Sequence, residues 1–348
     1  MDKEYILENK FDNTLDNYIS LFLPEIEIKL KSEMQEINQE NLHLISMLNY
    51  HMGWEGEEVG NESGGKRIRP LLVLLSTITT GGDWKEALPA AVSIELIHNF
   101  SLIHDDIEDE SNLRRGRETL WSKWGIAHAI NTGDLLFALA QNAIFKSKDY
   151  LTPETINDSI ELLLDTCIKL TEGQFVDLYF EDSINITVEQ YLSMISGKTA
   201  ALLSCATEIG AVIAGAGKET RNSMKQFGYS LGLAYQVIDD ILGIWGDEEI
   251  TGKPIASDLI QKKKTLPLVH ALNKSDDLKK IWLENEINSE NLDELLSRIE
   301  NTGAKEYAQL TAKTYSDSAL DALDKACKNK PGCRALLELT NRLLFRNR

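Results

Sequence analysis

Apolar residues recur three and four positions apart along nearly the whole chain, and this spacing restricts the possible folds more than any other feature. The period matches one face of an α-helix. No segment shows the alternation of apolar and polar residues, rich in Val, Ile and Thr and bounded by turn residues, that is typical of a β-sheet. The sequence therefore predicts an all-α protein.

Prolines and short clusters of Gly, Asn and Asp separate the helices that we expect. These helices span residues 15–50, 68–80, 85–109, 125–148, 153–172, 187–214, 217–245, 258–273, 276–286, 291–302, 304–328 and 331–346. The clearest loops, 61–65 and 246–254, are too short to link separate domains, and no internal repeat is apparent. We expect one helical domain over 1–348, in which 1–60 form an arm and a first helix without a recognisable motif.

Charge and hydrophobicity exclude several classes of function. The chain carries 36 Lys and Arg against 55 Asp and Glu, a net charge of −19. Nucleic-acid binding depends on clustered Lys and Arg, so we expect no such partner. Apolar residues make up 43%, enough for a large core. The longest apolar runs, 71–75 and 88–92, are far shorter than the ~20 residues that span a bilayer. With no signal peptide at the start, we expect a cytoplasmic protein without a membrane span.

The four cysteines form no C-x-x-C pair and are widely spaced for a zinc site or a disulfide framework. They are Cys167, Cys205, Cys327 and Cys333. We therefore expect buried free thiols in a reducing cytosol.

The most informative segment is a cluster of carboxylates directly after an apolar helix. Asp105 and Asp109 are four residues apart, which places them on one helix face. Like charges at that spacing destabilise a helix unless a cation lies between them. Mg²⁺ takes one or two carboxylates together with phosphate oxygens and water. The spacing therefore suits a magnesium–phosphate site, although a solvated charge run is the alternative for an isolated cluster.

A second carboxylate pair, Asp239 and Asp240, lies inside the apolar stretch from 227 to 245. Buried carboxylates without partners are costly. Such a pair needs either solvent on that face or a shared cation. Two such pairs in one helical chain are what a site with several Mg²⁺ ions in a helix bundle requires.

Further short motifs accompany the two aspartate clusters, and together they occupy residues 64–70, 95–98, 105–109, 114–116, 173–174, 197–199, 239–240, 251–254, 258 and 263–267. In this order, the motifs resemble those of the trans-isoprenyl diphosphate synthases of the polyprenyl synthetase family, which includes geranylgeranyl and farnesyl diphosphate synthases. The resemblance implies a single-domain isoprenoid synthase bundle of α-helices around a central cavity, usually as a homodimer.

The resemblance also implies a reaction, in which isopentenyl diphosphate is joined head-to-tail to an allylic diphosphate by ionisation, condensation and proton elimination. Departure of diphosphate develops negative charge, which Mg²⁺ and fixed cations stabilise. By the family pattern, Asp105 and Asp109 bind two Mg²⁺ ions and Asp239 a third, with Asp106 and Asp240 in support. We expect three Mg²⁺ ions per site when diphosphate is bound.

Cationic and polar side chains are carried over for both diphosphates. Arg114, Lys198 and Lys253 would hold the allylic diphosphate, accompanied by Gln174. The cradle for isopentenyl diphosphate would consist of Gly65, Lys66, Arg67 and Arg115, with His98. Thr199 and either Gln236 or Tyr235 would stabilise the carbocation or orient the chain, although Tyr235 could equally be an ordinary helix-packing residue. Arginine suits such a cradle because its planar fork pairs with two phosphate oxygens. Without the resemblance, Lys66 and Arg67 could simply begin a helix, and His98 could be a satisfied core histidine.

In this family the side chains before the first aspartate motif limit product length. Phe100 lies about 7.5 Å before Asp105 along the helix axis, and Ser101 is small. This pattern resembles geranylgeranyl diphosphate synthases, with farnesyl diphosphate as the alternative product. A Phe100 side chain that faces the outer core would change this interpretation.

Two positions depart from the family pattern. Gly243 replaces the final aspartate of the second motif, which removes an outer carboxylate and would weaken the third metal. Glu118 stands where proline is common.

The other functions left open are a class I terpene cyclase, a non-catalytic synthase subunit, and a metal-binding helical protein without diphosphate chemistry. The cradle and the second aspartate pair argue against the cyclase, and the retained aspartates argue against the non-catalytic subunit.

Overall fold

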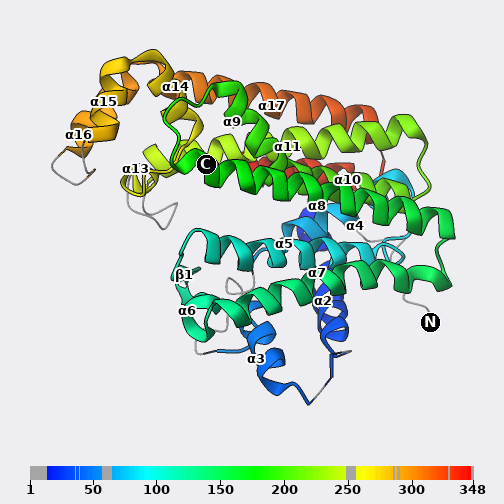
Figure 1. Cartoon of the computed structure of the whole chain (residues 1–348). Coiled ribbons are helices and arrows are strands. Elements are labelled where there is room, and N and C mark those ends of the chain that lie inside the picture. The colour runs from blue at the N-terminus through cyan, green and yellow to red at the C-terminus, as the bar shows by residue number, and fades with distance from the viewer. Residues whose placement is uncertain are drawn as a thin grey trace. The chain divides into compact units, whose positions relative to one another are not determined.

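The computed structural model describes residues 14–35, 37–38, 40–56, 65–247, 256–284, 287, 291–327 and 330–345. The chain divides into two compact units, which are described separately. Unit 1 contains residues 1–167, 205–224 and 325–338, and unit 2 contains 168–204, 225–324 and 339–348. Helices form most of both units (Figure 1), so the prediction of an all-α fold is confirmed. The expectation of a single domain stays a prediction.

Unit 1 is built around a central helix, α5 (Leu88–Glu108), which packs against α2, α4, α6 and α7. Figure 1 shows α5 and α7 side by side. The other elements of this unit are α2 (Leu15–Met34), α3 (Leu42–His51), α4 (Ile68–Thr80), β1 (Leu113–Arg114), β2 (Arg117–Glu118), α6 (Leu120–Trp124), α7 (Ile126–Phe145) and a 3₁₀ turn (Lys146–Asp149). Residues 70–77 of α4 are all buried, as expected for a helix that is apolar on every side.

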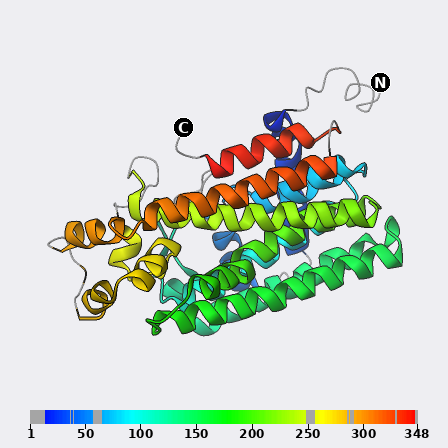
Figure 2. The ribbon, with the colours of Figure 1, turned by 90° about the horizontal axis from the view of Figure 1, so that it is seen from above.

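Unit 2 contains two clusters of buried apolar side chains. Its elements are α9 (Val188–Ile195), a π-helical turn (Ser196–Ala200), α13 (Ser257–Ile260), α14 (Leu266–Lys274), α15 (Asp276–Glu284) and α16 (Leu292–Glu300). Five helices have residues in both units: α8 (Pro153–Glu181), α10 (Ala201–Ile213), α11 (Lys218–Trp245), α17 (Ala304–Cys327) and α18 (Cys333–Leu344). Within unit 2, α11 and α17 lie side by side in both views (Figures 1 and 2), and Ser230 donates a hydrogen bond to Ser318 across them.

Several helix boundaries differ from the prediction because of local and tertiary contacts. The predicted helix 15–50 is two helices, α2 and α3, because the side chain of Asn38 accepts a hydrogen bond from the Glu40 amide and forms a turn. The predicted helix 153–172 continues to Glu181 as α8, through Gly173. The predicted helix 258–273 is interrupted between α13 and α14, where Lys262 adopts a left-handed conformation with φ 54°.

The expectation of four free thiols is wrong for one pair. Cys327 and Cys333 form a disulfide, with their α-carbons 5.7 Å apart. The bond joins the last residue of α17 to the first residue of α18. Cys167 and Cys205 are buried and take part in no disulfide, as expected. The pairing was missed because six residues separate the two cysteines, and only the turn between two helices brings them together.

Candidate active site

The first aspartate motif lies at the carboxyl end of α5, in unit 1. Asp105 is partly exposed and Asp109, which follows the last helical residue, is exposed. In the described part of the chain, no three His, Cys, Asp or Glu side chains gather tightly enough to hold a metal ion by themselves. Mg²⁺ commonly binds one or two carboxylates plus substrate phosphate oxygens. Asp105 and Asp109 offer carboxylate oxygens of this kind, so the residues present fit the ion.

Asp106, the middle aspartate, is arranged differently. It is 2% exposed, and Arg114 on β1 donates a hydrogen bond of 2.7 Å from Nε to its Oδ1. Burial raises the pKa of Asp106 to about 6, although the charge of Arg114 opposes this rise. The short hairpin of β1 and β2 therefore places Arg114 directly on the aspartate motif. Asp106 uses one carboxylate oxygen for this ion pair.

A group of cationic side chains surrounds His98 of α5. Arg69 on α4 lies 3.1 Å from His98, measured from Nη1 to Nε2. Burial lowers the pKa of His98 well below its ordinary value, and the charges of Arg69, Arg115 and Arg114 lower it further. His98 is therefore neutral, and its ring nitrogen accepts a hydrogen bond from the guanidinium of Arg69. The structure brings together residues of α4, α5 and the hairpin that are up to 46 positions apart, from 69 to 115.

The loop before α4 is shaped by a close approach between Gly65 and Arg115. Gly65 has φ +82°, and a Cβ on it would lie 2.6 Å from Nη2 of Arg115. Only glycine adopts this positive φ without strain and has no Cβ to overlap with Arg115. The next residue, Lys66, is exposed. The predicted cradle residues Gly65, Lys66, Arg115 and His98 are therefore found in one unit.

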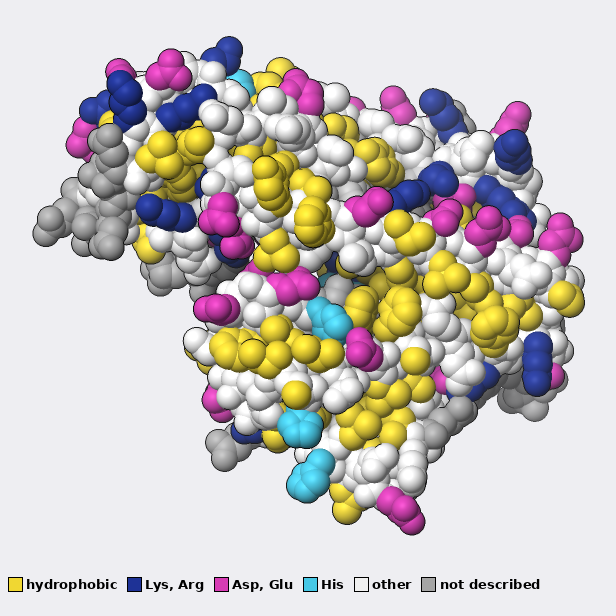
Figure 3. Space-filling view, viewed as in Figure 1, with side chains coloured by type: hydrophobic (Ala, Val, Ile, Leu, Met, Phe, Trp, Pro, Cys, Tyr) yellow, Lys and Arg dark blue, Asp and Glu magenta, His cyan; other side chains and the backbone are white. Residues whose placement is uncertain are grey.

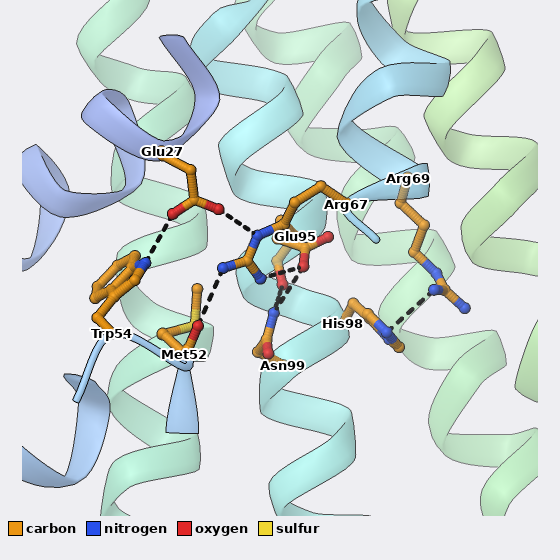
Figure 4. Close-up of polar contacts among 8 residues, drawn as sticks. All are labelled: Glu27, Met52, Trp54, Arg67, Arg69, Glu95, His98 and Asn99. Carbon is orange, nitrogen blue, oxygen red and sulfur yellow. Dashed lines mark hydrogen bonds and ion pairs between the residues drawn. The ribbon is translucent and has the colours of Figure 1, made fainter. Parts of the chain in front are cut away.

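Arg67, also predicted for the cradle, points elsewhere. Its side chain is 3% exposed and forms ion pairs with Glu27 of α2 and Glu95 of α5. Figure 4 shows that the guanidinium lies between these two carboxylates and the Met52 carbonyl. Arg69, two residues later, takes the position beside His98. The sequence motif contained both arginines, but their neighbours in space distinguish them.

The second aspartate motif lies on α11 in unit 2, and its two aspartates also differ. Asp239 is exposed, whereas Asp240 is 3% exposed. Tyr191 donates a hydrogen bond of 2.5 Å to Oδ2 of Asp240, and the Leu266 amide donates one of 2.9 Å to the same oxygen. Burial raises the pKa of Asp240 to about 7. Asp240 thus fastens α11 to α9 and to the start of α14.

A chain of amide and hydroxyl contacts links Asp240 to the predicted substrate residues. Gln236 donates from Nε2 to Oδ1 of Asp240 at 3.0 Å, and Thr199 donates to Oε1 of Gln236 at 2.9 Å. Thr199 belongs to the π-helical turn, and Gln236 to α11. The structure therefore joins Thr199 and Gln236, which the sequence separates by 37 positions.

The π-helical turn packs backbone to backbone against α8. A Cβ on Gly173 would lie 2.8 Å from the Gly197 carbonyl carbon, and one on Gly197 would lie 2.5 Å from the Lys169 carbonyl oxygen. These two glycines allow the approach, which brings Lys198 within 2.5 Å of Asp177. The contact explains why α8 continues past the predicted end at residue 172.

The sequence reasoning missed Arg69, which contacts His98 although it lies in the recognised segment 64–70. It also missed Asp177 and Tyr191, which contact the predicted residues Lys198 and Asp240. Asp177 lies one helical turn after Gln174, on the same face of α8. Tyr191 lies seven residues, or two turns, before Lys198. For Asp177 and Tyr191, helical spacing from a recognised motif residue was the available signal.

Of the predicted residues, Lys253 lies outside the described residues, as do positions 1–13 of the predicted N-terminal arm.

The predicted product-length residues lie on α5. The Phe100 ring contacts His104 of the same helix and Phe137 of α7, with ring centroids 4.7 and 5.2 Å apart. Ser101 donates a hydrogen bond to the His98 carbonyl. An aromatic pair therefore stands about one turn before Asp105.

Comparison with known proteins identifies these motifs. Residues 58–300 match the model of the family described as polyprenyl synthetase. The chain belongs to the polyprenyl synthetase family. As a member, it is a trans-prenyltransferase. In the described residues, no helix is long and apolar enough to cross a membrane.

Individual relatives carry different product names. A geranylgeranyl diphosphate synthase of Mycobacterium tuberculosis is 43% identical over 66% of this chain and 65% of its own length. A (2E,6E)-farnesyl diphosphate synthase of Mycobacterium bovis is 37% identical over 80% of this chain and 79% of its own.

Solved structures of synthases have a fold similar to that of this chain. A geranylgeranyl pyrophosphate synthetase of Pyrococcus horikoshii has a TM-score of 0.86 and 31% identity, covering 94% of this chain and 98% of its own. A geranylgeranyl pyrophosphate synthase of Corynebacterium glutamicum, complexed with isoprenyl diphosphate and magnesium, has a TM-score of 0.80 and 26% identity, covering 96% of this chain and 99% of its own. The family uses Mg²⁺.

Proposed function

We propose that this prenyltransferase condenses isopentenyl diphosphate with an allylic diphosphate and releases geranylgeranyl diphosphate as its main product. The observation that carries the product assignment is the Phe100–Phe137 ring pair before the first aspartate motif. An aromatic pair limits the room for a growing tail, while Ser101 leaves more room than a second aromatic on α5 would. Farnesyl diphosphate is the alternative, since one of the relatives carries that product name.

Mg²⁺, when bound, supplies positive charge that stabilises the departing diphosphate. We assign Asp105, Asp109 and Asp239 as its ligands, for three ions in total. The accessible aspartates, Asp105 and Asp109 in the first motif and Asp239 in the second, would face the ion. The buried one, Asp106 or Asp240, would fix the helix that carries the motif. This division of roles is supported by the hydrogen bonds of Asp106 and Asp240 to protein donors.

The chain's own cations orient the two anionic substrates. Arg114 and Lys198 would bind the allylic diphosphate, with Gln174 and Lys253. Lys66, Arg115 and the Arg69–His98 pair would bind isopentenyl diphosphate, with the backbone of Gly65 close to its oxygens. Thr199 and Gln236 present oxygen atoms that would stabilise the allylic carbocation. The released diphosphate would take up the proton that is eliminated.

Product analysis tests this function. The enzyme is incubated with Mg²⁺, labelled isopentenyl diphosphate and, in turn, dimethylallyl, geranyl or farnesyl diphosphate. A product series that ends at twenty carbons is expected, and one that ends at fifteen would replace geranylgeranyl by farnesyl diphosphate. Asp105→Ala and Asp239→Ala should each abolish turnover and leave the helical circular-dichroism spectrum unchanged. Retained turnover in either variant would refute the metal assignment.

Two controls distinguish the other readings. Hydrocarbon released without isopentenyl diphosphate would indicate a cyclase. No product from any primer would indicate a non-catalytic subunit, and Mg²⁺ binding that does not depend on added diphosphate would indicate a plain metal-binding protein.

We also propose that the enzyme is a homodimer. Ile126, Ile130 and Phe145 of α7 are exposed, and Figure 3 shows apolar side chains on the α7 side of unit 1. A second copy would remove such side chains from water. Sedimentation at micromolar concentration should give twice the chain mass of 39.1 kDa. A monomer at that concentration would refute the proposal.

A further inference from the structure

Arg67 occupies an unusual backbone position at the start of α4. It is the residue before the first helical turn, and it adopts the left-handed conformation with φ 48° and ψ 35°. Non-glycine residues rarely adopt this conformation, and the surrounding structure must compensate for the strain. The contacts of the Arg67 side chain provide that compensation.

All three nitrogen atoms of the Arg67 guanidinium donate to protein oxygens. Nε donates to Oε1 of Glu27 at 2.7 Å, Nη1 to Oε1 of Glu95 at 2.8 Å, and Nη2 to the Met52 carbonyl at 3.2 Å. Burial by itself would lower the pKa of Arg67, but the charges of Glu95 and Glu27 raise it above its ordinary value. The side chain is therefore a buried cation neutralised within the protein. Its planar fork is not open to a phosphate group.

The carboxylates that hold Arg67 are held in turn. Trp54 donates from Nε1 to Oε2 of Glu27 at 2.7 Å, and Asn99 donates from Nδ2 to Oε1 of Glu95 at 3.1 Å. Figure 4 shows these contacts together with Arg67 at their centre. The network joins α2, the segment after α3, the start of α4 and the middle of α5.

The network lies next to the cationic cradle on both helices. Arg69 follows Arg67 by two residues on α4, and His98 follows Glu95 by three residues on α5, about one turn. The Arg67–Glu95 ion pair and the Arg69–His98 hydrogen bond therefore cross the same two helices. Figure 4 shows them as two neighbouring links between α4 and α5. Loosening the first link should displace the second.

We propose that Arg67 is a positioning residue for isopentenyl diphosphate, which acts through Glu95 and Glu27 by fixing Lys66, Arg69 and His98. It does not contact the diphosphate itself. This inference rests on the proposed function, because it takes Lys66, Arg69 and His98 as the binding residues for that substrate.

A substitution that removes the charge of Glu95 changes the affinity for isopentenyl diphosphate in opposite directions if Arg67 positions the cradle and if Arg67 binds the diphosphate directly. If Arg67 bound the diphosphate directly, Glu95→Gln would free a cation, remove a negative charge, and tighten binding. If Arg67 positions the cradle, Glu95→Gln and Arg67→Gln should weaken binding alike. The double variant should then be no weaker than the poorer single variant, since residues in one network are not additive.

Calorimetric titration with isopentenyl diphosphate alone, in Mg²⁺ buffer, measures this binding without turnover. We expect Glu95→Gln and Arg67→Gln each to weaken binding about tenfold, as for loss of a hydrogen bond to a charged group. Glu27→Gln, at the partly exposed end of the network, should weaken binding less, and it serves as the variant if Glu95→Gln does not fold. The matched control is Arg298→Gln, which breaks the exposed pair with Glu294 and should bind as the wild type does.

Steady-state kinetics compare the KM values for the two substrates, and a general loss of protein stability would not raise one of them selectively. The KM for isopentenyl diphosphate should rise in the Arg67 and Glu95 variants, while the KM for the allylic diphosphate stays within about twofold. Unchanged or tighter binding in Glu95→Gln or Glu27→Gln would overturn the inference and leave the proposed function intact. Failure of the wild type to bind isopentenyl diphosphate would overturn the proposed function and the inference with it.

Discussion

Asp258 lies against the backbone of Gly243, and its carboxylate occupies the space in which any other side chain at position 243 would begin. A Cβ on Gly243 would lie 2.5 Å from Cγ of Asp258, closer than real Cβ atoms approach other atoms. Gly243 belongs to α11, and Asp258 to α13. The glycine that replaces the final aspartate of the second motif is thus matched to a nearby carboxylate. This contact gives the departure from the family pattern a steric reason.

Gly243→Ala should destabilise the protein. Alanine in place of glycine inside a helix normally stabilises it by about 1 kcal/mol. Here the overlap with Asp258 should dominate, because overpacking a filled site costs about 1–3 kcal/mol. Urea unfolding measures the difference. Gly217→Ala, directly before the first residue of α11, is the control for an added methyl group without a steric overlap, since a Cβ there would meet nothing within 4 Å. Equal stability of Gly243→Ala and the wild type would mean that Asp258 moves aside easily.

Gly243→Asp, which restores the usual motif, should lose turnover rather than gain it. The added carboxylate would compete with Asp258 for the same space and place two like charges together. Turnover at several Mg²⁺ concentrations measures the effect. A gain in turnover, or a lower Mg²⁺ requirement, would show that the third aspartate can be accommodated.

Phe100→Ala should lengthen the product by one or more five-carbon units. The substitution removes the ring that contacts Phe137 and opens the space before Asp105. Chromatography of the dephosphorylated products measures chain length. Phe145→Ala, on the exposed end of α7, should leave the product unchanged. A product of unchanged length from Phe100→Ala would mean that another residue limits the tail.

The stability of the protein should fall below pH 6.5, in part because of His51. Burial lowers the pKa of His51 to about 3, and the charges of Arg114, Arg115 and Arg67 lower it further. Between about pH 6.5 and 3 the unfolded chain therefore binds one more proton than the folded chain at this residue, so stability decreases as the pH decreases.

His51→Gln should make this loss smaller by about 2 kcal/mol between pH 6.5 and 5, because each pH unit corresponds to about 1.4 kcal/mol per proton. Urea unfolding at both pH values provides the measurement. The exposed His128 offers a control, and His128→Gln should keep the pH dependence of the wild type. An identical pH dependence in His51→Gln would contradict the assignment of a neutral histidine with a lowered pKa.

Reduction of the Cys327–Cys333 disulfide should lower the free energy of unfolding. The bond closes a loop with a sequence separation of 6 residues. The chain-entropy model gives about 2 kcal/mol for a loop of this size. Urea unfolding with and without a phosphine reductant measures the change, and Cys333→Ser should not respond to the reductant. Four reactive thiols in the unfolded, unreduced protein would show that the bond is absent.

Local patterns in the sequence determined much of the fold and the position of the motifs. The predicted helix 68–80 coincides with α4, and the predicted helix 85–109 differs from α5 by three residues at one end and one at the other. Apolar periodicity and prolines suffice for such helices, because both act over a few residues. The same spacing predicted Asp105 and Asp109 on one helix face. The order of the motifs was enough for the family.

Only the tertiary structure decided which of two neighbouring residues with the same or similar side chain is buried in a network and which is accessible. Arg67 and Arg69 belong to one motif, as do Asp239 and Asp240, and residue type cannot separate them. Arg67 can be buried because Glu27 and Glu95, on two other helices, form ion pairs with it. Asp240 can be buried because Tyr191, also on another helix, donates a hydrogen bond to it. The pairing of Cys327 with Cys333 likewise depends on a turn between helices. A sequence gives the chemistry available at each position, whereas burial and partners depend on residues that folding brings from far along the chain.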